Sequence, residues 1–211
     1  MNEQFFAEND IDKTIRNQFF PDYSYKGTFV EIGGADPQFI SMSNHFKLNN
    51  WRTIIIEPNP RFFKKHIEYG NEAYQYACSD SNQNDVDFTI VHMSVGGSVT
   101  DESFSSLKIK DSYRNMNPSW VDSLNKTVIK INTKTLDTII KECNISHIDI
   151  LSVDTEGWEL EVMKGLSIIH PKIVILENIL SDVVVYREYM ASRNYHFYSK
   201  IGNNDIYTKN L

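Results

Sequence analysis

The sequence predicts an α/β fold built on one mainly parallel sheet with helices on both faces. Short runs of β-branched and other apolar residues recur along the chain, and segments with helical periodicity separate them. Such alternation is typical of β-α-β units, whose strands are parallel. Near the C-terminal end, GNND at 202–205 lies between two further strand-like runs and predicts a hairpin that adds an antiparallel edge.

Three strands and two helices are predicted in the first 78 residues. The strand segments are short and apolar: GTFVEI (27–32), RTIIIE (52–57) and AYQYAC (73–78). SMSNHFKLNN (41–50) predicts a helix between the first two strands. The next helix, NPRFFKKHIEYG, carries three terminal signals, because Asn59 can cap it, Pro60 suits its first position and Gly70 suits its end.

The alternation continues through the rest of the chain. The later apolar runs are VDFTIV (86–91), KTVIKINTKTLDTIIKECN (126–144), HIDILSVD (147–154) and KIVILEN (172–178). EGWELEVMKGLSIIH (156–170) predicts a helix, and the tail from Tyr186 predicts a helix followed by the two hairpin strands. DSNQNDVD (80–87) and HMSVGGSVTDESFSS (92–106) are polar enough to predict loops, and the second would suit a mobile lid.

Composition excludes several classes of partner. The chain has 21 basic and 28 acidic side chains, and the basic ones are scattered, so nucleic acid and anionic membranes are not expected to bind. No apolar run approaches the ~18 residues of a membrane span, and the acidic N-terminal segment is unlike a signal peptide. A soluble, cytoplasmic protein is therefore expected. Cys78 and Cys143 lie in apolar surroundings and are expected to be buried thiols without a disulfide framework.

A mainly parallel sheet binds its ligand at the carboxyl ends of the strands, where the winding reverses. Residues that follow the predicted strands are Glu31, Gly33, Gly34, Asp36, Glu57, Cys78, Ser79, Asp80, Asp154 and Glu156. Most of the charged ones are acidic and would repel a diphosphate, and Asp36 and Pro37 stand where a dinucleotide loop uses bare backbone. Glu57 is placed to accept both hydroxyls of a ribose. A ligand with a ribose and a cation but no diphosphate is indicated, and S-adenosylmethionine has this composition.

Six segments in this order resemble the FkbM family of S-adenosylmethionine-dependent O-methyltransferases. They are FVEIGGADP, SMSNHF, IIIEPNPRFF, ACSD, TLDTII and HIDILSVDTEGWELEVMKGL, and the resemblance spans roughly residues 3–180. It implies the seven-stranded, Rossmann-like class I methyltransferase fold. One domain is expected over residues 1–211, with an N-terminal helical segment (1–27) that could lie on the acceptor side and a Rossmann-like core (28–211). In the glycine loop, Gly34 stands for the family's alanine, Ala35 for its asparagine and Pro37 for its glycine.

The resemblance also implies cofactor roles. Glu31 and Gly33 would lie near the methionine moiety, Ser43 and Asn44 would face its carboxylate, and Glu57 would take the ribose hydroxyls. Cys78, Ser79 and Asp80 would edge the adenine, and Asp154 would lie beside the sulfonium. The complete set of candidate cofactor-binding residues is Glu31, Gly33, Gly34, Asp36, Ser43, Asn44, Glu57, Pro58, Asn59, Cys78, Ser79, Asp80 and Asp154.

Methyl transfer to a hydroxyl group requires removal of its proton. Asp154 and Glu156 flank a predicted strand-to-helix turn and are the candidates for this task. Two close carboxylates could instead bind a divalent metal, and the sequence leaves both roles open. His92 is an alternative base. Trp158 could stack on a sugar ring or belong to the core.

Many members of the family methylate hydroxyl groups of sugars or glycans, so the resemblance implies a small-molecule or oligosaccharide acceptor. Two other functions remain open from the sequence. A NAD-dependent Rossmann oxidoreductase is one, although GxGxxG is missing. The other is a non-catalytic cofactor-binding domain of a larger glycan-assembly protein, with a companion glycosyltransferase.

Overall fold

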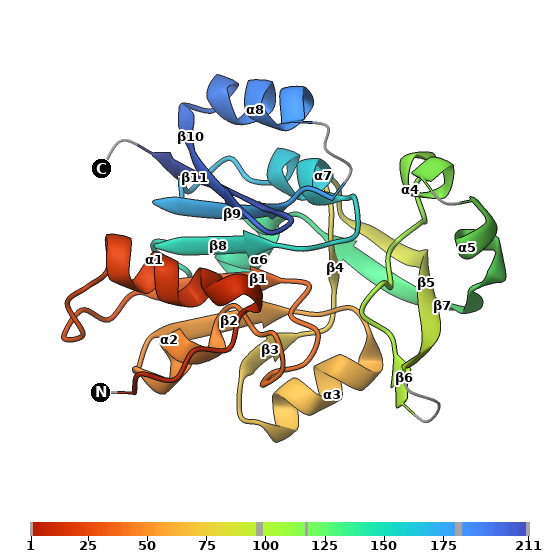
Figure 1. The fold of residues 1–211 in the computed structure, drawn as a ribbon, viewed down its shortest axis with the longest axis horizontal. Helices are drawn as coiled ribbons and strands as arrows, with labels where there is room; N and C mark the ends of the chain where they lie inside the picture. Colours follow the sequence, from red (N-terminus) through yellow and green to blue (C-terminus); the bar gives the residue numbers. More distant parts are fainter. Residues whose placement is uncertain (1, 96–98, 117, 180–182, 210–211) are drawn as a thin grey trace.

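The computed structural model describes residues 2–95, 99–116, 118–179 and 183–209 (Figure 1). Within these residues a seven-stranded sheet has the order β10-β11-β9-β8-β1-β2-β3. Its strands are β1 (Thr28–Ile32), β2 (Arg52–Ile56), β3 (Glu72–Tyr74), β8 (Ile150–Val153), β9 (Ile173–Glu177), β10 (Tyr195–Ile201) and β11 (Asn204–Lys209). Five neighbouring strands of this sheet, β3, β2, β1, β8 and β9, are parallel. β11 and β10 add an antiparallel edge beside β9. The predicted fold class is confirmed.

Helices cover both faces of this sheet. They are η1 (Glu8–Asp10), α1 (Ile11–Phe19), α2 (Asn44–Leu48), α3 (Pro60–Glu68), α6 (Leu136–Glu142), α7 (Glu159–Lys164) and α8 (Val183–Ser192). Apolar residues of α6, α7 and α8 pack on one face of the sheet, and those of α1 and α2 pack on the other. Because β1 pairs with β2 on one side and β8 on the other, the winding reverses at β1. The carboxyl ends of β1 and β8 therefore mark the expected ligand edge.

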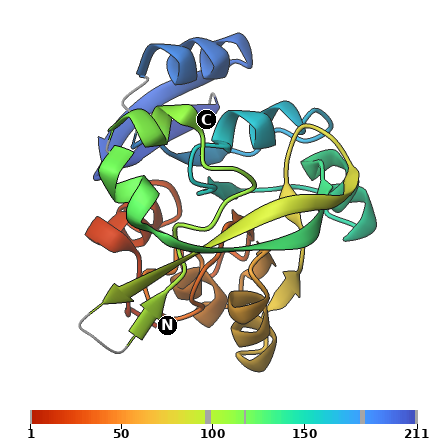
Figure 2. The same cartoon turned by 90° about the vertical axis from the view of Figure 1, so that its right-hand side faces the viewer.

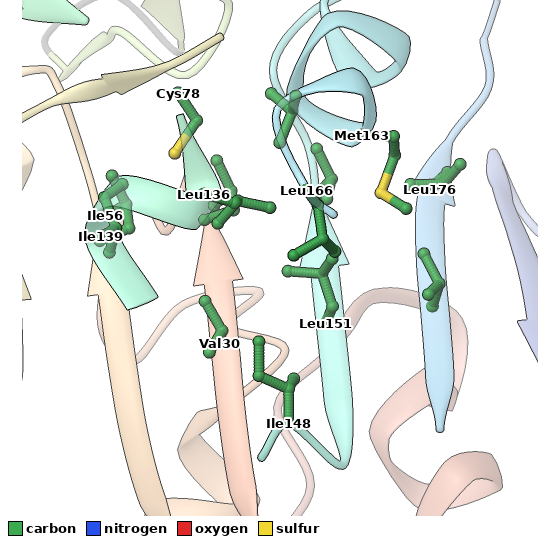
Figure 3. Close-up of a cluster of buried hydrophobic side chains, with 14 of the residues drawn as sticks. Val30, Ile56, Cys78, Leu136, Ile139, Ile148, Leu151, Met163, Leu166 and Leu176 are labelled. Atoms are coloured by element: carbon green, nitrogen blue, oxygen red, sulfur yellow. The ribbon is translucent and has the colours of Figure 1, made fainter. Parts of the chain in front are cut away.

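Two apolar clusters fix the helices to the sheet. The larger one packs α6, α7 and α8 against alternate residues of the parallel strands, among them Val30, Ile56 and Leu151 (Figure 3). The other packs Ile11, Ile15 and Phe46 from α1 and α2 against Phe29 and its neighbours on the opposite face. Every residue of β1 is buried, including the polar Thr28 and Glu31, as is typical of a central strand covered on both faces.

The terminal signals of α3 act as predicted. The Asn59 side chain accepts a hydrogen bond from the backbone N–H of Arg61 at 2.9 Å, and Pro60 is the first helical residue. Gly70, just after the helix, has a φ of +76°, a conformation that favours glycine. Neither Cys78 nor Cys143 forms a disulfide, and both are buried. None of the described helices is long and apolar enough to cross a membrane.

Three predictions about the middle of the chain are wrong. AYQYAC is not one strand, since β3 ends at Tyr74 and the next short strand, β4 (Ala77–Cys78), belongs to a second sheet. Both polar stretches predicted as loops are partly strand: β5 (Gln83–Val95) takes up 83–87 of the first and 92–95 of the second, and β6 (Val99–Asp101) lies in the second. Residues 96–98 of the predicted lid lie outside the described residues.

The second sheet explains these errors: β5, β6 and β7 (Asn125–Lys134) form an antiparallel ribbon, and the short β4 pairs with β7 in parallel. The order of this sheet is β4-β7-β5-β6, and β7 pairs along most of β5. In Figure 2 this ribbon lies across the front of the molecule. Much of its surface is solvated, and polar pairs such as Asp87–Lys130, at 2.6 Å, join its strands. The apolar alternation that marks a half-buried strand is therefore weak in the polar stretches. Two short helices, α4 (Asp111–Met116) and α5 (Pro118–Ser123), precede β7.

Candidate active site

A cleft of about 640 Å³, including open space at its mouth, lies at the carboxyl ends of β1, β2 and β8. It is lined by these predicted cofactor or catalytic residues: Gly33, Glu57, Pro58, Asn59, Cys78, Asp154 and Glu156. The other residues that line it are Ile32, Ala35, Phe62, Ala77, Phe88, Glu102, Ser103, Ser105, Ser106, Leu107, Thr155 and Trp158. Several of these come from the β5–β6 region, so the ribbon forms one wall of the cleft.

The turn after β1 is built for close approach of two strands. The backbone N–H of Gly33 donates to the carbonyl of Ile56 at 2.9 Å, and the N–H of Asp154 donates to the carbonyl of Ile32 at 3.0 Å. Gly33 has a φ of +80°, and a Cβ there would be 1.8 Å from the carbonyl oxygen of Asp154. The glycine is required because the backbones after β1 and β8 touch here.

Glu57 lies at the end of β2 and is almost completely buried, yet it lines the cleft. Its Oε2 accepts from the N–H of Ala35 at 2.9 Å, and its Oε1 accepts from the N–H of Asn59 at 2.7 Å. These bonds fix the carboxyl group between the β1 turn and the start of α3. Burial raises the pKa of Glu57 to about 7, and the charges of Asp154 and Glu31 add to this effect.

Eight predicted residues do not line the cleft: Glu31, Gly34, Asp36, Ser43, Asn44, Ser79, Asp80 and His92. Glu31 is buried behind it, where its carboxyl group accepts hydrogen bonds from the N–H of Met42 and the hydroxyl of Ser43. Burial raises the pKa of Glu31 to about 7.

Other predicted residues that do not line the cleft contact neighbouring parts of the fold. Asp36 pairs with Lys65 at 2.6 Å, and a Cβ on Gly34 would be 2.4 Å from Ile55. The side chain of Asn44 accepts from the hydroxyl of Tyr69 at 3.0 Å. The backbone N–H of Ser79 donates to Lys134 in the second sheet, and Asp80 is exposed.

Three carboxyl groups converge beside the cleft. One oxygen each from Asp154, Glu156 and Glu177 lies within 4.8 Å of the other two. Burial and the nearby charge of Glu159 raise the pKa of Asp154, and burial with the charge of Asp154 raises the pKa of Glu177. The sequence analysis missed Glu177, although its position at the end of a predicted strand, as for Glu57 and Asp154, was a usable signal.

Comparison with known proteins identifies the family. The family described as methyltransferase FkbM domain matches residues 31–197, which is most of the chain. The chain belongs to the FkbM methyltransferase family. A crystal structure described as methyltransferase FkbM from Methylobacillus flagellatus KT is similar to it in fold, with a TM-score of 0.50 and 12% sequence identity. The similarity covers 95% of this chain and 50% of that one, so this chain spans about half its length. No curated protein matches.

Within the FkbM domain of this chain, Glu159 holds the turn that carries Asp154 and Glu156. Its Oε1 accepts from the N–H groups of Thr155 and Gly157, both at 3.0 Å. Its Oε2 accepts from the hydroxyl of Tyr186 on α8 at 2.7 Å. Glu156 has a φ of +56°, so the turn is in a conformation that non-glycine residues rarely adopt. Sequence reasoning missed Glu159 because an acid in the first turn of a helix is common.

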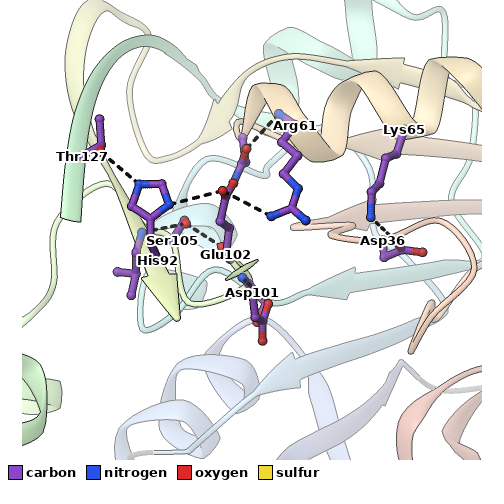
Figure 4. A network of polar contacts seen from close by, with 11 residues as sticks. Asp36, Arg61, Lys65, His92, Asp101, Glu102, Ser105 and Thr127 are labelled. Carbon is purple, nitrogen blue, oxygen red and sulfur yellow. Dashed lines mark hydrogen bonds and ion pairs between the residues drawn. The ribbon is translucent and has the colours of Figure 1, made fainter. Parts of the chain in front are cut away.

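Glu102 connects the ribbon of the FkbM domain to α3. Its carboxyl group accepts from the Asn59 side chain at 3.0 Å and lies 3.3 Å from both Arg61 and His92 (Figure 4). The other ring nitrogen of His92 lies 2.9 Å from the Thr127 hydroxyl. His92, the alternative base, thus contacts Glu102, which lines the cleft, but does not line the cleft itself.

Trp158 fixes the segment that follows Glu102. Its indole N–H donates to the carbonyl of Lys108 at 2.9 Å. Lys110 lies 4.7 Å from the centre of the Trp158 ring and pairs with Glu161 at 2.8 Å. The side chain of Trp158 therefore lines the cleft and also anchors its wall to α7.

Proposed function

We propose that this methyltransferase transfers a methyl group from S-adenosylmethionine to a hydroxyl group of a sugar or glycan. The observation that carries the proposal is the position of Glu57, buried at the end of β2 and lining the cleft. Each of its oxygens accepts one backbone N–H and keeps a further lone pair, so the carboxylate can also accept from ribose hydroxyls. The chemistry of this acceptor group fits the ribose of the cofactor.

The charge of the cleft supports a cationic cofactor. Glu57, Asp154 and Glu156 line it, and no diphosphate would be stable beside so many carboxylates. A sulfonium and an ammonium group would be favoured there. S-adenosylmethionine, when bound, supplies an electrophilic methyl group on a cationic sulfur. These properties favour it over NAD, as does membership of a methyltransferase family.

The acceptor is proposed to enter from a second cavity. Ser106 and Glu156 line both the cleft and an adjoining space of about 300 Å³. The remaining walls of this space are apolar: Val91, Phe104, Ile109, Val121 and Leu124. A hydroxyl group held where the two spaces meet would lie near Glu156. We assign to Glu156, with Asp154, the removal of the hydroxyl proton.

Two measurements test this function. Isothermal titration with S-adenosylhomocysteine is expected to give micromolar affinity, and NAD is expected to give no binding. Radiolabelled methyl transfer from S-adenosylmethionine to a panel of glycosides and oligosaccharides then tests the acceptor class. Binding of NAD alone would contradict the cofactor, and transfer only to non-carbohydrate hydroxyls would contradict the acceptor class.

A further inference from the structure

We propose that Asp154, Glu156 and Glu177 bind a divalent cation that prefers oxygen ligands, such as Mg²⁺ or Mn²⁺. The three ligand oxygens lie within 4.8 Å of one another. Cation–oxygen distances of about 2.0 to 2.6 Å allow two oxygens on one ion to be about 4 to 5 Å apart at most. The three carboxyl groups are therefore close enough to share one ion without a rearrangement of the backbone.

Glu177 provides an independent reason to expect a ligand. Glu177 is only 8% exposed. Among the described residues, its Oε2 has no hydrogen-bond partner. It faces the carboxyl group of Asp154 instead of a donor. Asp154 is half-buried, and two carboxylates that lie so close together repel each other unless a proton or a cation lies between them. Two lysines of the described residues pair with other acids, Lys110 with Glu161 and Lys200 with Asp205.

The fold holds the three groups in fixed relative positions. Val153, the last residue of β8, is the partner of Leu176 of β9 in the parallel register, and Asp154 and Glu177 directly follow these two residues. Their side chains therefore start from neighbouring points at the same edge of the sheet. Glu156 comes from the turn that Glu159 stabilises through the N–H groups of Thr155 and Gly157. Such prior positioning reduces the entropy lost when an ion binds.

The catalytic use of the ion rests on the proposed function. Three carboxylate oxygens leave further positions on a six-coordinate ion, which an acceptor hydroxyl can occupy. Coordination lowers the pKa of that hydroxyl. Its proton passes to the Glu156 oxygen that is not on the ion, and the acceptor oxygen forms a bond to the methyl carbon. The carbon–sulfur bond breaks, and its electron pair remains on sulfur.

The test measures binding of Mn²⁺ to EDTA-treated, dialysed protein. The electron paramagnetic resonance signal of free Mn²⁺ gives the amount bound. One ion per chain is expected for the wild type. Glu177→Gln, which keeps the shape of the side chain, is expected to weaken binding at least tenfold. Glu142→Gln is the matched control, since Glu142 is a surface acid paired with Lys134. It is expected to bind Mn²⁺ as the wild type does.

Several outcomes overturn the cation site. No Mn²⁺ binding by the wild type at millimolar concentration would mean that a proton separates Asp154 from Glu177. Unchanged binding by Glu177→Gln would exclude Glu177 as a ligand. If that variant does not fold, Asp154→Asn serves in its place, with circular dichroism as the check on folding. S-adenosylhomocysteine binding without Mn²⁺ binding would leave the proposed function intact, whereas Mn²⁺ binding without cofactor binding would support only the cation site.

Discussion

The backbone of Gly33 lies against the carbonyl oxygen of Asp154, so closely that a Cβ on Gly33 would be 1.8 Å from that oxygen. This contact joins the turn after β1 to the residue after β8, at the point where the winding of the sheet reverses. The backbone of Asp154 is consequently fixed at this contact. A change at Gly33 must move one of the two turns.

Gly33→Ala is expected to lower the free energy of unfolding by more than Gly70→Ala does. Both glycines have positive φ, +80° and +76°, and an alanine in that conformation costs about 1 to 2 kcal/mol. Nothing lies within 4 Å of a Cβ at Gly70, so that variant should lose only this amount. Urea denaturation measures both. Equal losses would show that the contact with Asp154 relaxes without cost.

Glu159→Ala is expected to destabilise the turn between β8 and α7 and to abolish methyl transfer. It removes the acceptor for the N–H groups of Thr155 and Gly157, and each buried unsatisfied donor costs about 1 to 3 kcal/mol. Denaturation and methyl transfer are measured together. Glu161→Ala, whose carboxylate pairs with Lys110 and Lys164 instead, is the control and should retain more stability. A Glu159 variant as stable as this control would contradict the positioning role.

The Glu31→Gln variant should isolate one pH-dependent contribution to stability. Glu31 has a folded pKa of about 7 against 4.5 unfolded, so the folded protein binds more protons between these values. The stabilisation that results is present below pH 4.5 and is lost as the pH rises to 7. Stability of the wild type minus that of the variant should fall by roughly 3 kcal/mol across this range, at about 1.4 kcal/mol per pH unit.

Urea denaturation at several pH values gives this difference. His45 and His66, whose pKa values burial lowers, change stability in the opposite sense, but they are present in both proteins. A difference that stays constant or rises with pH would show that Glu31 is already ionised in the folded protein at pH 4.5.

Glu57→Gln is expected to weaken binding of S-adenosylhomocysteine about tenfold to a hundredfold at pH 8. The amide has one acceptor oxygen where the carboxylate has two, so an acceptor for a ribose hydroxyl is lost, and hydrogen bonds to a charged group contribute about 1.5 to 3 kcal/mol. Isothermal titration measures the affinity. Glu68→Gln, an exposed acid on α3 paired with Lys64, should bind as the wild type does. Equal affinities in both variants would remove Glu57 from the cofactor site.

Glu102→Ala is expected to loosen the ribbon wall without unfolding the sheet. The variant lacks the contacts with Asn59, Arg61 and His92 that tie this wall to α3 and β5. Amide hydrogen exchange should accelerate about tenfold at Ser106, whose N–H donates to the carbonyl of Thr89, and remain unchanged in β1. Unchanged exchange at Ser106 would mean that the backbone pairing alone holds the wall.

The parallel sheet could be predicted because its strands are buried on both faces. Ile54, Ile55 and Ile56 are all fully buried, and such a run has few alternatives to a central strand. Asn59 and Pro60 predicted the start of α3 because a helix cap and a first-turn proline act within one turn of the chain. The cleft residues Glu57 and Asp154 followed from their positions at strand ends.

Other parts of the site depend on contacts between distant residues. Glu102 lies in a polar stretch, and its partners Asn59 and His92 come from separate elements. Glu159 accepts a hydrogen bond from Tyr186, 27 residues further on, which an ordinary first-turn acid does not do. Neither contact can be predicted from the periodicity or the composition of the sequence. The ribbon that carries Glu102 was missed for the same reason, since polar side chains cover much of its surface.

Because β4 and β7 pair, the segment between them, which carries the ribbon and its helices, begins and ends at neighbouring positions. Ala77 and Cys78 lie in parallel register with Thr133 and Lys134, so the chain leaves the core and returns to it at adjacent positions. Residues 79–132 can therefore change in length or be exchanged for another segment while the ends stay where they are. On the proposed function, changes within residues 79–132 would alter acceptor preference while β1, β2 and β8 keep the cofactor edge of the sheet.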